Sequence, residues 1–392
     1  MSKADPPRIA VIGAGPIGIE AALYAKSLGY PVVVFERGEV GENLSRWGHV
    51  RLFTPFAMNC TPLGLDAIRK EHPQHAIPGP TDLITGLQHR DGYLLPLMLT
   101  TALCDSIRMK TEILHIGRRN VIRNDPSTDP KRAASPFRIL ARDDKQIEQM
   151  HDADVVLDCT GTYGKHRWLG DGGIPALGER AAEKQIVYGL EDVLGPRKAH
   201  YAGKSIIVIG GGYSAATTVC ALAGLTEQNS ATWIIWLNRG PRGTPLPRTS
   251  TDPLRERDRL AARANSLATR GEGHVEYHAH TAVDAIECHG PDRGFRVSAR
   301  CNGEEMTWEV DRLIANIGSA PDLSFCRELH VIEPDGKMGV RQPEPNYFLL
   351  GAKSLGRDSN FLLRTGFEQI RDVFAQISGK PRLDLFAKPL AA

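Results

Sequence analysis

The chain has 392 residues, more than a single hydrophobic core usually organises, so two domains are expected. Its 48 Lys and Arg residues nearly balance 46 Asp and Glu residues, and no basic block is present that could grip a nucleic-acid backbone. The N-terminal MSKADPP lacks an apolar signal core, and no hydrophobic run approaches the roughly 20 residues that span a bilayer. We therefore expect a cytoplasmic protein that acts on neither nucleic acid nor a membrane.

The first stretch with a clear pattern is IAVIGAGPIGIEAALYAKSLGYPVVVFERG, residues 9–38. It opens with a short apolar run, Ile9–Ile12, which is typical of a parallel strand covered on both faces. A turn in GxGxxG spacing follows, made of Gly13, Gly15, Pro16 and Gly18. In this pattern the first glycine makes a tight turn, the second lets the backbone approach a pyrophosphate, and the third lets a helix lie close to the strand.

We expect that helix over residues 16–29, with its free N–H groups and dipole facing the phosphates. A second strand over 32–35 leads to Glu36 and Arg37. Glu36 stands 18 residues after Gly18, where a carboxylate can accept hydrogen bonds from both hydroxyls of a ribose. Because strand, helix and terminal acid all agree, the stretch predicts an adenine dinucleotide site.

Residues 41–99 contain Pro, His and Trp and lack sustained periodicity until a helix is expected over 91–107. An insertion after an acid-tipped strand emerges at the carboxyl edge of a parallel sheet, where ligands bind in doubly wound folds. We therefore assign this insertion to the substrate side. Its candidates for the walls of a cofactor pocket are Arg46, Trp47, His49 and Arg51.

The opening phrase returns as SIIVIGGGYSAATTVCALAG, residues 205–224, in GxGxxA form. The residues expected to bind here are Gly210, Gly212, Tyr213, Ser214 and Ala215. The next strand ends in Asn238 and Arg239, so no carboxylate is present to accept from a 2'-hydroxyl. Arg239, with Arg242 and Arg248 nearby, favours a 2'-phosphate, and this copy therefore predicts NADPH over NADH.

The duplication extends beyond the glycines. Residues 137–161 and 295–318 share FRxxAR, a strand pair and an apolar run that ends in glycine, so each copy looks like a βαβ module with a three-stranded crossover. The first glycine of the turn and the FRxxAR segment are 124 residues apart in the first copy and 85 residues apart in the second. The first copy therefore has about 39 extra residues, which we assign to the insertion. The expected fold is α/β, with two Rossmann-like, three-layer ββα dinucleotide-binding domains.

Together these motifs resemble those of the two-dinucleotide flavoprotein superfamily, which includes thioredoxin reductase-like enzymes and flavin-containing monooxygenases. The resemblance implies FAD at the first site and NADPH at the second. It implies an FAD domain of residues 1–165 and 312–392, into which an NADPH domain of residues 166–311 is inserted. VVLDCTGTYG and LIANIGSAPD resemble the segments that cross between the domains, which adds Thr160, Gly161 and Gly318 to the expected cofactor-binding residues.

NYFLLGAKSLGRDSNFLLRTGFEQI, residues 346–370, resembles the family's final strand, turn and helix, which close over the flavin ring. The family usually carries Gly-Asp after that strand, and its Asp binds the ribityl chain. Here Gly351 is followed by Ala352, so either Asp358 or backbone groups replace the contact, or the flavin is held more loosely. Ser359 is the expected N-cap of the closing helix, as a plain cap or beside a helix terminus that stabilises reduced flavin.

The chemistry after flavin reduction is open. No CxxC is present for a dithiol relay, and the seven cysteines are scattered. Residues 42–56 resemble a segment of flavin-containing monooxygenases, although the FxGxxxHxxxY/F signature of those enzymes is missing before Gly210. We expect an enzyme that takes hydride from NADPH and transfers one oxygen atom from O2 to a small substrate.

Two alternatives remain. One is an NAD(P)H-dependent reductase of an external disulfide, quinone or protein, using at most an isolated cysteine such as Cys60 or Cys159. The other is a flavin-binding sensor without turnover. The sequence identifies no catalytic residue and no metal ligand, and it leaves the substrate and the oligomeric state open, a homodimer being one option.

Overall fold

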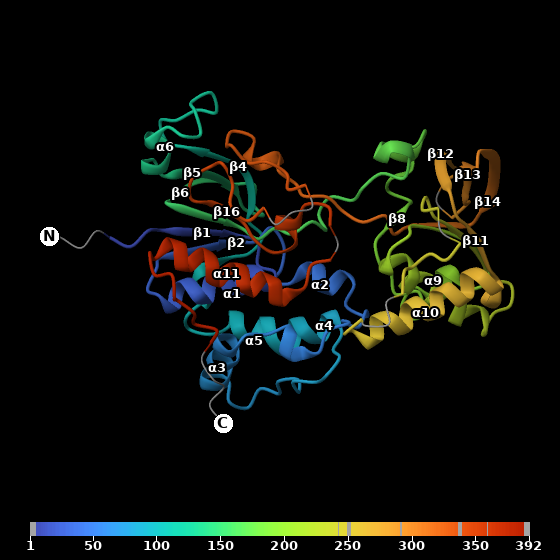
Figure 1. Cartoon of the computed structure of the whole chain (residues 1–392), viewed down its shortest axis with the longest axis horizontal. Coiled ribbons are helices and arrows are strands. Elements are labelled where there is room, and N and C mark those ends of the chain that lie inside the picture. The colour runs from blue at the N-terminus through green and yellow to red at the C-terminus, as the bar shows by residue number, and fades with distance from the viewer. Residues whose placement is uncertain are drawn as a thin grey trace. The chain divides into compact units, whose positions relative to one another are not determined.

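Figure 1 shows the computed structural model of the chain, which describes residues 5–241, 243–248, 252–290, 292–335, 339–358 and 360–387. The chain divides into two compact units: residues 1–165 with 320–392 form unit 1, and residues 166–319 form unit 2. The return to unit 1 therefore comes after residue 319, not after the predicted residue 311. The reason is that β15 (Arg312–Ala315) pairs with β9 (Ser205–Ile209) in the sheet of unit 2.

Unit 1 is built on a five-stranded parallel sheet in the order β16–β7–β1–β2–β3. The first two strands begin and end where the apolar runs predict them. The strands are β1 (Ile9–Ile12), β2 (Val32–Phe35), β3 (Ile107–Arg108), β7 (Val155–Asp158) and β16 (Tyr347–Leu349).

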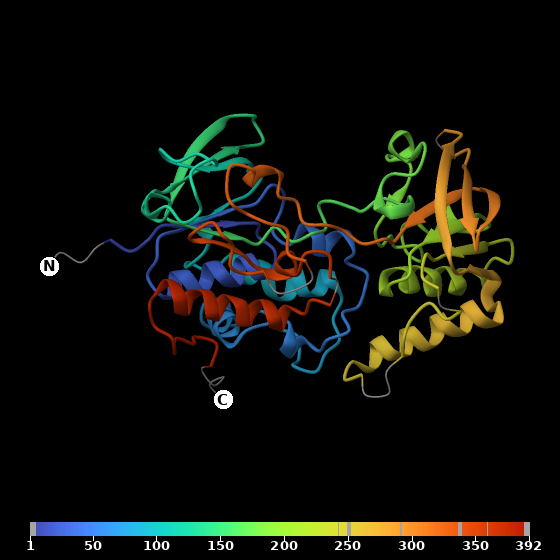
Figure 2. The same cartoon turned by 45° about the horizontal axis from the view of Figure 1, so that its top comes forward.

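Both faces of this sheet are covered, as the unbroken apolar strands require. Alternate residues of β1 enter different cores: Ile9 and Val11 pack with α1 (Pro16–Ser27) and α11 (Leu363–Ile377), which lie alongside each other in Figure 2. Ala10 and Ile12 pack on the other face, against an antiparallel sheet. That sheet has the order β4–β5–β6, with β4 (Glu112–Arg118), β5 (Phe137–Arg142) and β6 (Glu148–Ala153).

The insertion of unit 1 is mostly short helices. They are α2 (Glu42–Arg46), η1 (Phe56–Met58), α3 (Pro62–Glu71), α4 (Gly86–His89), η2 (Arg90–Leu94), α5 (Leu95–Met98) and η3 (Cys104–Ser106). The helix expected over 91–107 begins earlier, at Gly86, and ends at Met98. Pro96 has no backbone N–H, and the helix widens into the π-helical turn η2 just before it.

Unit 2 repeats the plan. Its parallel sheet has the order β11–β10–β9–β15–β8, with β8 (Val187–Tyr188), β10 (Trp233–Leu237) and β11 (Val275–His278) beside β9 and β15. One face is covered by α9 (Tyr213–Thr226) and α10 (Arg255–Arg270). The other face meets the antiparallel sheet β12–β13–β14, made of β12 (Thr281–Cys288), β13 (Phe295–Cys301) and β14 (Glu304–Val310).

Each FRxxAR segment is therefore the central strand of a three-stranded antiparallel sheet, β5 in unit 1 and β13 in unit 2, as the duplication predicts. The remaining short elements are α6 (Pro130–Ala134), η4 (Asp171–Gly173), α7 (Glu179–Ala182), α8 (Lys198–Tyr201), η5 (Glu272–His274), η6 (Ser324–Cys326) and η7 (Gly351–Leu355). Among the described residues, no helix is long and apolar enough to cross a bilayer.

Candidate functional site

The glycine turn of unit 1 leaves space for a ligand at only one of its three glycines. Gly13 has φ +97°, and a Cβ added there would lie 2.9 Å from the carbonyl oxygen of Cys159. A Cβ added at Gly18 would overlap the Gly13 carbonyl oxygen, because α1 crosses close to the strand. At Gly15 an added Cβ would meet no atom of the described residues within 4 Å. The open space thus lies in front of the backbone that precedes Pro16, the first residue of α1.

Glu36 stands at the end of β2, as predicted, and its carboxylate holds the glycine turn. Oε2 accepts a 2.7 Å hydrogen bond from the amide of Ala14, and Oε1 accepts a 2.9 Å bond from the amide of Gly38. Arg37 is exposed, and its Nη2 lies 2.8 Å from the position of a Cβ added at Gly164. The acid therefore reaches the phosphate-binding loop as well as the strand end where a ribose would lie.

Of the four pocket-wall candidates in the insertion, Trp47 is the best placed. Its indole packs on Gly86, where an added Cβ would lie 2.6 Å from the ring, and its centroid is 6.3 Å from that of Tyr163. The indole Nε1 is buried and has no hydrogen-bond partner among the described residues. Arg46 instead pairs with Glu42 at 2.5 Å, and 55% of its side chain is exposed. His49 and Arg51 are also exposed.

A buried polar network that the sequence reading missed lies at the carboxyl end of β7. Lys353 and Asp158 form an ion pair of 2.6 Å with both side chains 0% exposed. The ammonium also donates to Thr160 Oγ1 at 2.9 Å and to the carbonyl oxygen of Asp322 at 2.7 Å. The Tyr347 hydroxyl donates to Asp158 at 2.9 Å. The only signal in the sequence was the lysine in Gly351-Ala352-Lys353, where the family pattern departs.

The turn after β16 differs from the expectation in two respects. Gly351 has φ +74°, and its amide donates to Gln369 Oε1 on α11 at 2.8 Å. The helix begins at Leu363 after the N-cap Leu362, so the capping role predicted for Ser359 is wrong, and Ser359 itself lies outside the described residues. The Asp358 carboxylate accepts from the amide and side chain of Asn360, at 2.9 and 2.8 Å. That carboxylate is engaged in its own loop.

The second glycine turn has the same mechanics. Gly210 has φ +148°, and an added Cβ would overlap the carbonyl oxygen of Asn316. Gly212 faces open space, since no atom in the described part of the chain lies within 4 Å of an added Cβ. The helix α9 then starts at Tyr213 and Ser214, and Ala215 is fully buried at the helix–strand contact. As in unit 1, the second glycine of the GxGxx pattern is the one left open.

The end of β10 carries no carboxylate, and the side chain of Asn238 there forms hydrogen bonds within the protein. Asn238 is buried, accepts from the amide of Gly240 at 2.9 Å and donates to the Tyr277 hydroxyl at 3.0 Å. Arg239 is exposed. Of the two other arginines considered, Arg248 is tied to Asp258 on α10 by bonds of 2.8 and 2.7 Å, and Arg242 lies outside the described residues. Of these arginines, Arg239 is the one that the structure describes as exposed and without an ion pair to Asp258 at this strand end.

Asn316 is a second residue that the sequence reading missed. It follows β15, next to the turn at Gly210, and is only 6% exposed. Its amide donates to the carbonyl oxygen of Gly189 at 2.6 Å, while its Oδ1 is buried with no hydrogen-bond partner in the described part of the chain. Gly318, predicted to bind, follows two residues later with φ +80°. An unpaired buried acceptor is costly and fits a polar ligand that supplies the missing donor.

The two cysteines considered for a reductase, Cys60 and Cys159, show no sign of activation. All seven cysteines lie in the described residues and form no disulfide. Burial, with the Glu20 carboxylate nearby, raises the pKa of Cys60 to about 12. Burial, with Asp158 beside it, likewise raises the pKa of Cys159. Both thiols proposed for a reductase are thus protonated at neutral pH, and thiolate is the nucleophilic form. The described residues also contain no group of three or more potential metal ligands.

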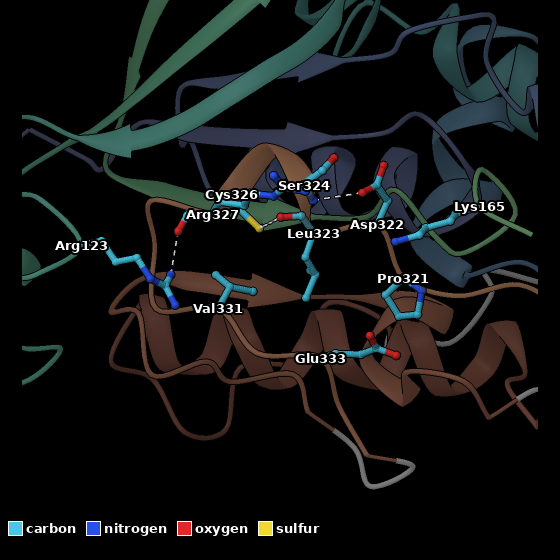
Figure 3. Close-up of a pocket in the computed structure, with 10 residues that line it drawn as sticks. All are labelled: Arg123, Lys165, Pro321, Asp322, Leu323, Ser324, Cys326, Arg327, Val331 and Glu333. Carbon is cyan, nitrogen blue, oxygen red and sulfur yellow. Dashed lines mark hydrogen bonds between the residues drawn. The ribbon is translucent and has the colours of Figure 1, made fainter. Parts of the chain in front are cut away.

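A cavity of about 450 Å³ lies on unit 1, and Figure 3 shows the residues that line it. Its walls are Arg123, Lys165, Pro321, Asp322, Leu323, Ser324, Cys326, Arg327, Val331 and Glu333. Arg123 donates to the carbonyl oxygen of Arg327 at 2.7 Å, and Asp322 accepts from the amide of Ser324 at 3.0 Å. None of the residues predicted to bind a cofactor lines this cavity, and its charges are of both signs.

Comparison with known proteins agrees with this geometry. Residues 10–77 match the family model of pyridine nucleotide-disulphide oxidoreductases. The chain covers 96% of its length and 100% of bacillithiol disulfide reductase Bdr (YpdA) from Bacillus cereus, with a TM-score of 0.72 and 16% identity. The chain has the fold of the two-dinucleotide flavoproteins. The resemblance and the fold class expected from the sequence are confirmed.

Two further structures with this fold are oxygenases. The chain covers 99% of its length and 99% of DfoA, the FAD-bound cadaverine monooxygenase of Erwinia amylovora, with a TM-score of 0.65 and 14% identity. It covers 95% of its length and 99% of the ornithine hydroxylase PvdA from Pseudomonas aeruginosa, with a TM-score of 0.66 and 14% identity. A comparison with curated protein sequences finds no significant match. Reductases and oxygenases thus share this fold.

Proposed function

We propose that the protein is an FAD-dependent oxidoreductase that takes hydride from NADPH, with FAD at the glycine turn of unit 1 and NADPH at that of unit 2. The observation that carries the proposal is the pair of open cradles at Gly15 and Gly212, each before a helix N-terminus at the carboxyl edge of a parallel sheet. The family model over residues 10–77 supports the same class of enzyme. When bound, the two cofactors supply hydride transfer, and the chain supplies position and charge.

The two units suit different dinucleotides. In unit 1, Glu36 offers a carboxylate at the ribose end, and Gly13 and Gly18 bring α1 close to the strand. In unit 2, Asn238 and the exposed Arg239 replace the acid, which favours a 2'-phosphate over a free hydroxyl. The unpaired Oδ1 of Asn316 supports a ligand with an N–H or O–H donor at the inner end of that site. These differences support the assignment of FAD to unit 1 and of NADPH to unit 2.

The subsequent step that we propose is transfer of one oxygen atom from O2 to a small substrate. The chain has no CxxC, and the two thiols considered for a relay, Cys60 and Cys159, have raised pKa values because they are buried. A route that needs no cysteine thiolate therefore suits this chain best. Fold similarity to DfoA and PvdA is compatible with this route, and the amines that their names imply are the natural first substrates to test.

A reductase of a small external disulfide is the second candidate. It is favoured by the likeness to Bdr, which extends over 100% of that chain with a TM-score of 0.72. In this case the disulfide would take up electrons without a thiolate relay from Cys60 or Cys159. A sensor without turnover is the weakest candidate, because a second intact nucleotide turn at Gly210 has little use in it.

One experiment separates these candidates. The purified protein is reduced with NADPH without oxygen, and then mixed either with O2 and an amine such as cadaverine or ornithine, or with bacillithiol disulfide in the absence of O2. Formation of a hydroxylated amine in step with NADPH use is the expected result. Thiol release without O2 would replace the oxygen-transfer proposal by the reductase. A protein that stays colourless when supplied with FAD would overturn both.

A further inference from the structure

Lys353 is the one buried lysine among the described residues, and it connects three segments of unit 1. It belongs to η7, the turn that follows β16. Its ammonium contacts Asp158 and Thr160, where the chain leaves the sheet toward unit 2, and the carbonyl of Asp322, where the chain has just returned. These outgoing and returning stretches, residues 159–165 and 320–323, are here called the crossover segments.

All three N–H bonds of the ammonium have an acceptor, and the partners are also satisfied. Asp158 Oδ1 accepts from the Thr160 hydroxyl at 2.7 Å, and Asp158 Oδ2 accepts from Tyr347 at 2.9 Å. Lys353 also lies 4.7 Å from the ring centroid of Phe325. A lysine has three donors, so the network leaves none of them unused. The ammonium thus joins all three segments by direct hydrogen bonds.

Such a pair is a poor way to gain stability. Removing two charges from water costs several kcal/mol per ion, and apolar residues of similar size often stabilise a protein equally well. What a fully satisfied buried pair does fix is the position of the segments that it joins. They are the backbone at Thr160–Gly161 and the turn at Gly351, both at the carboxyl edge of the parallel sheet.

Unit 2 provides an internal comparison. In the sheet of unit 1, Asp158 is paired in register with Ile12, the residue before the first glycine of the turn. The equivalent residue, paired with Ile209 before Gly210, is Ala315. Ala315 is buried and has no side chain that could form an ion pair. The network therefore belongs to the unit to which we assign the flavin and not to the duplicated framework.

The crossover segments also contact each other within unit 1. The amide of Ala320 donates to the carbonyl oxygen of Lys165 at 2.9 Å, so the two stretches run side by side at the point where they leave the unit. Asp322 and Lys165 both line the cavity in Figure 3. A cation that bonds to both stretches fixes their ends relative to the turn at Gly351.

We infer that Lys353 is a positioning residue of the flavin site, whose ammonium locks the turn at Gly351 to the unit 1 ends of both crossover segments. This inference rests on the proposed binding of FAD to unit 1. Ala352 occupies the place of the acid that the family uses at this turn, and the next residue, Lys353, bonds the turn to both crossover segments. The flavin is thus positioned by a backbone that the buried pair keeps in one conformation.

The test uses the full-length protein and the double variant Lys353→Met with Asp158→Asn. The double change leaves no unpaired charge in the core, whereas Lys353→Met alone strands the Asp158 carboxylate and is expected to unfold more easily. In the folded double variant, FAD should bind about tenfold more weakly, because two charge-assisted hydrogen bonds to the crossover segments are lost. Hydrogen exchange in the apoprotein should be faster at residues 159–165 and 320–323.

A matched control lies in the same unit. Arg118 is also buried in an ion pair at 0% exposure, with Glu344, but at the amino end of β16. Arg118→Met leaves Glu344 paired with Arg132 and should reduce stability without changing FAD affinity or exchange in the crossover segments. Equal FAD affinity and equal exchange in the double variant and the wild type would overturn the role of Lys353 while leaving the proposed function intact. If the double variant exchanges faster but the wild type binds no FAD, Lys353 positions the crossover segments and the proposed flavin site is wrong.

Discussion

The two units share a fold but not the way in which their ligand edges are fixed. In unit 1, the Glu36 carboxylate bonds to the glycine turn, and a buried ion pair fixes the adjacent strand ends. In unit 2, the Asn238 side chain bonds to Gly240 and Tyr277, the Trp236 indole donates to the Gly210 carbonyl oxygen, and Ala315 occupies the place of the buried acid. The ligand edge of unit 1 therefore contains a buried ion pair that unit 2 lacks at the equivalent position.

This difference fits the two kinds of cofactor that we propose, one that stays bound and one that is exchanged in each cycle. A cofactor that stays bound gains from a rigid, preorganised site, because little ordering remains to be done when it binds. A cofactor that must leave after each hydride transfer is better served by an edge with fewer constraints. We expect changes in unit 1 to affect stability and flavin together, and changes in unit 2 to affect nicotinamide binding with the flavin retained.

The largest effect is expected from Gly18→Ala. An added Cβ would overlap the Gly13 carbonyl oxygen, so the backbone must shift, at a cost of about 3 kcal/mol. The equivalent position in unit 2 is already Ala215, and Ala215→Gly should cost only about 1 kcal/mol, as for an ordinary helix glycine. Urea unfolding of both variants measures the difference. Similar losses in the two units would refute the closer helix–strand contact in unit 1.

The second effect is a pH dependence confined to unit 1. Glu20 on α1 is fully buried between Thr61 and Tyr93, and burial raises its pKa from 4.5 to about 7. Between these values the folded protein holds a proton that the unfolded chain has lost. This contribution to stability is present below pH 4.5 and is lost as pH rises toward 7, by on the order of 3 kcal/mol.

Glu20→Gln tests this, since an amide keeps hydrogen-bonding capacity without a titrating proton. The unfolding free energy of the variant, measured from pH 5 to pH 8, should fall less steeply than that of the wild type. The equivalent residue on α9 is Thr217, whose hydroxyl donates to the carbonyl oxygen of Tyr213 at 2.9 Å and does not titrate. Thr217→Val therefore serves as the control, with an unchanged pH slope. Parallel slopes for wild type and Glu20→Gln would show that Glu20 titrates normally.

The third effect concerns the choice of nicotinamide. Arg239→Ala should weaken NADPH about tenfold or more and leave NADH nearly unchanged, because a charge-assisted bond to the 2'-phosphate is lost. Arg248→Ala is the matched control, since Arg248 is already paired with Asp258. Rates of anaerobic flavin reduction over a range of each nucleotide give the comparison. An unchanged preference in Arg239→Ala would remove this arginine from the recognition of NADPH.

The smallest effect on the stability of the protein is expected at Gly15 and Gly212, the two glycines that face open space. Gly15→Ala and Gly212→Ala place a methyl group where no protein atom lies within 4 Å, so the stability of the apoprotein should stay within about 1 kcal/mol. Each should nevertheless weaken its own dinucleotide, FAD for Gly15 and NADPH for Gly212, as judged by titration. Gly117→Ala and Gly224→Ala, which also face open space, are the controls. Full affinity in both cradle variants would count against the phosphate positions.

The sequence predicted the parts of the fold that depend on local pattern. Unbroken apolar runs placed β1 and β2 at the residues where they occur, and the repeated FRxxAR segments identified both antiparallel sheets. Helix limits were less well predicted: the helix expected over 91–107 ends at Met98, and α11 starts at Leu363 without Ser359. The ends of these helices depend on tertiary packing and on Pro96. The hydrophobic periodicity of the sequence therefore does not predict them.

What the sequence by itself determined is the duplicated framework, because glycine spacing, strand hydrophobicity and a terminal acid are local constraints of chain geometry. Only the tertiary structure decided which polar groups meet. Lys353 and Asp158 are 195 positions apart, and the unpaired oxygen of Asn316 is defined by its neighbours and not by its own sequence context. Folding pairs Lys353 with Asp158 and leaves the Asn316 oxygen without a partner. The free-energy cost of burying a polar group depends on the partners that folding brings to it.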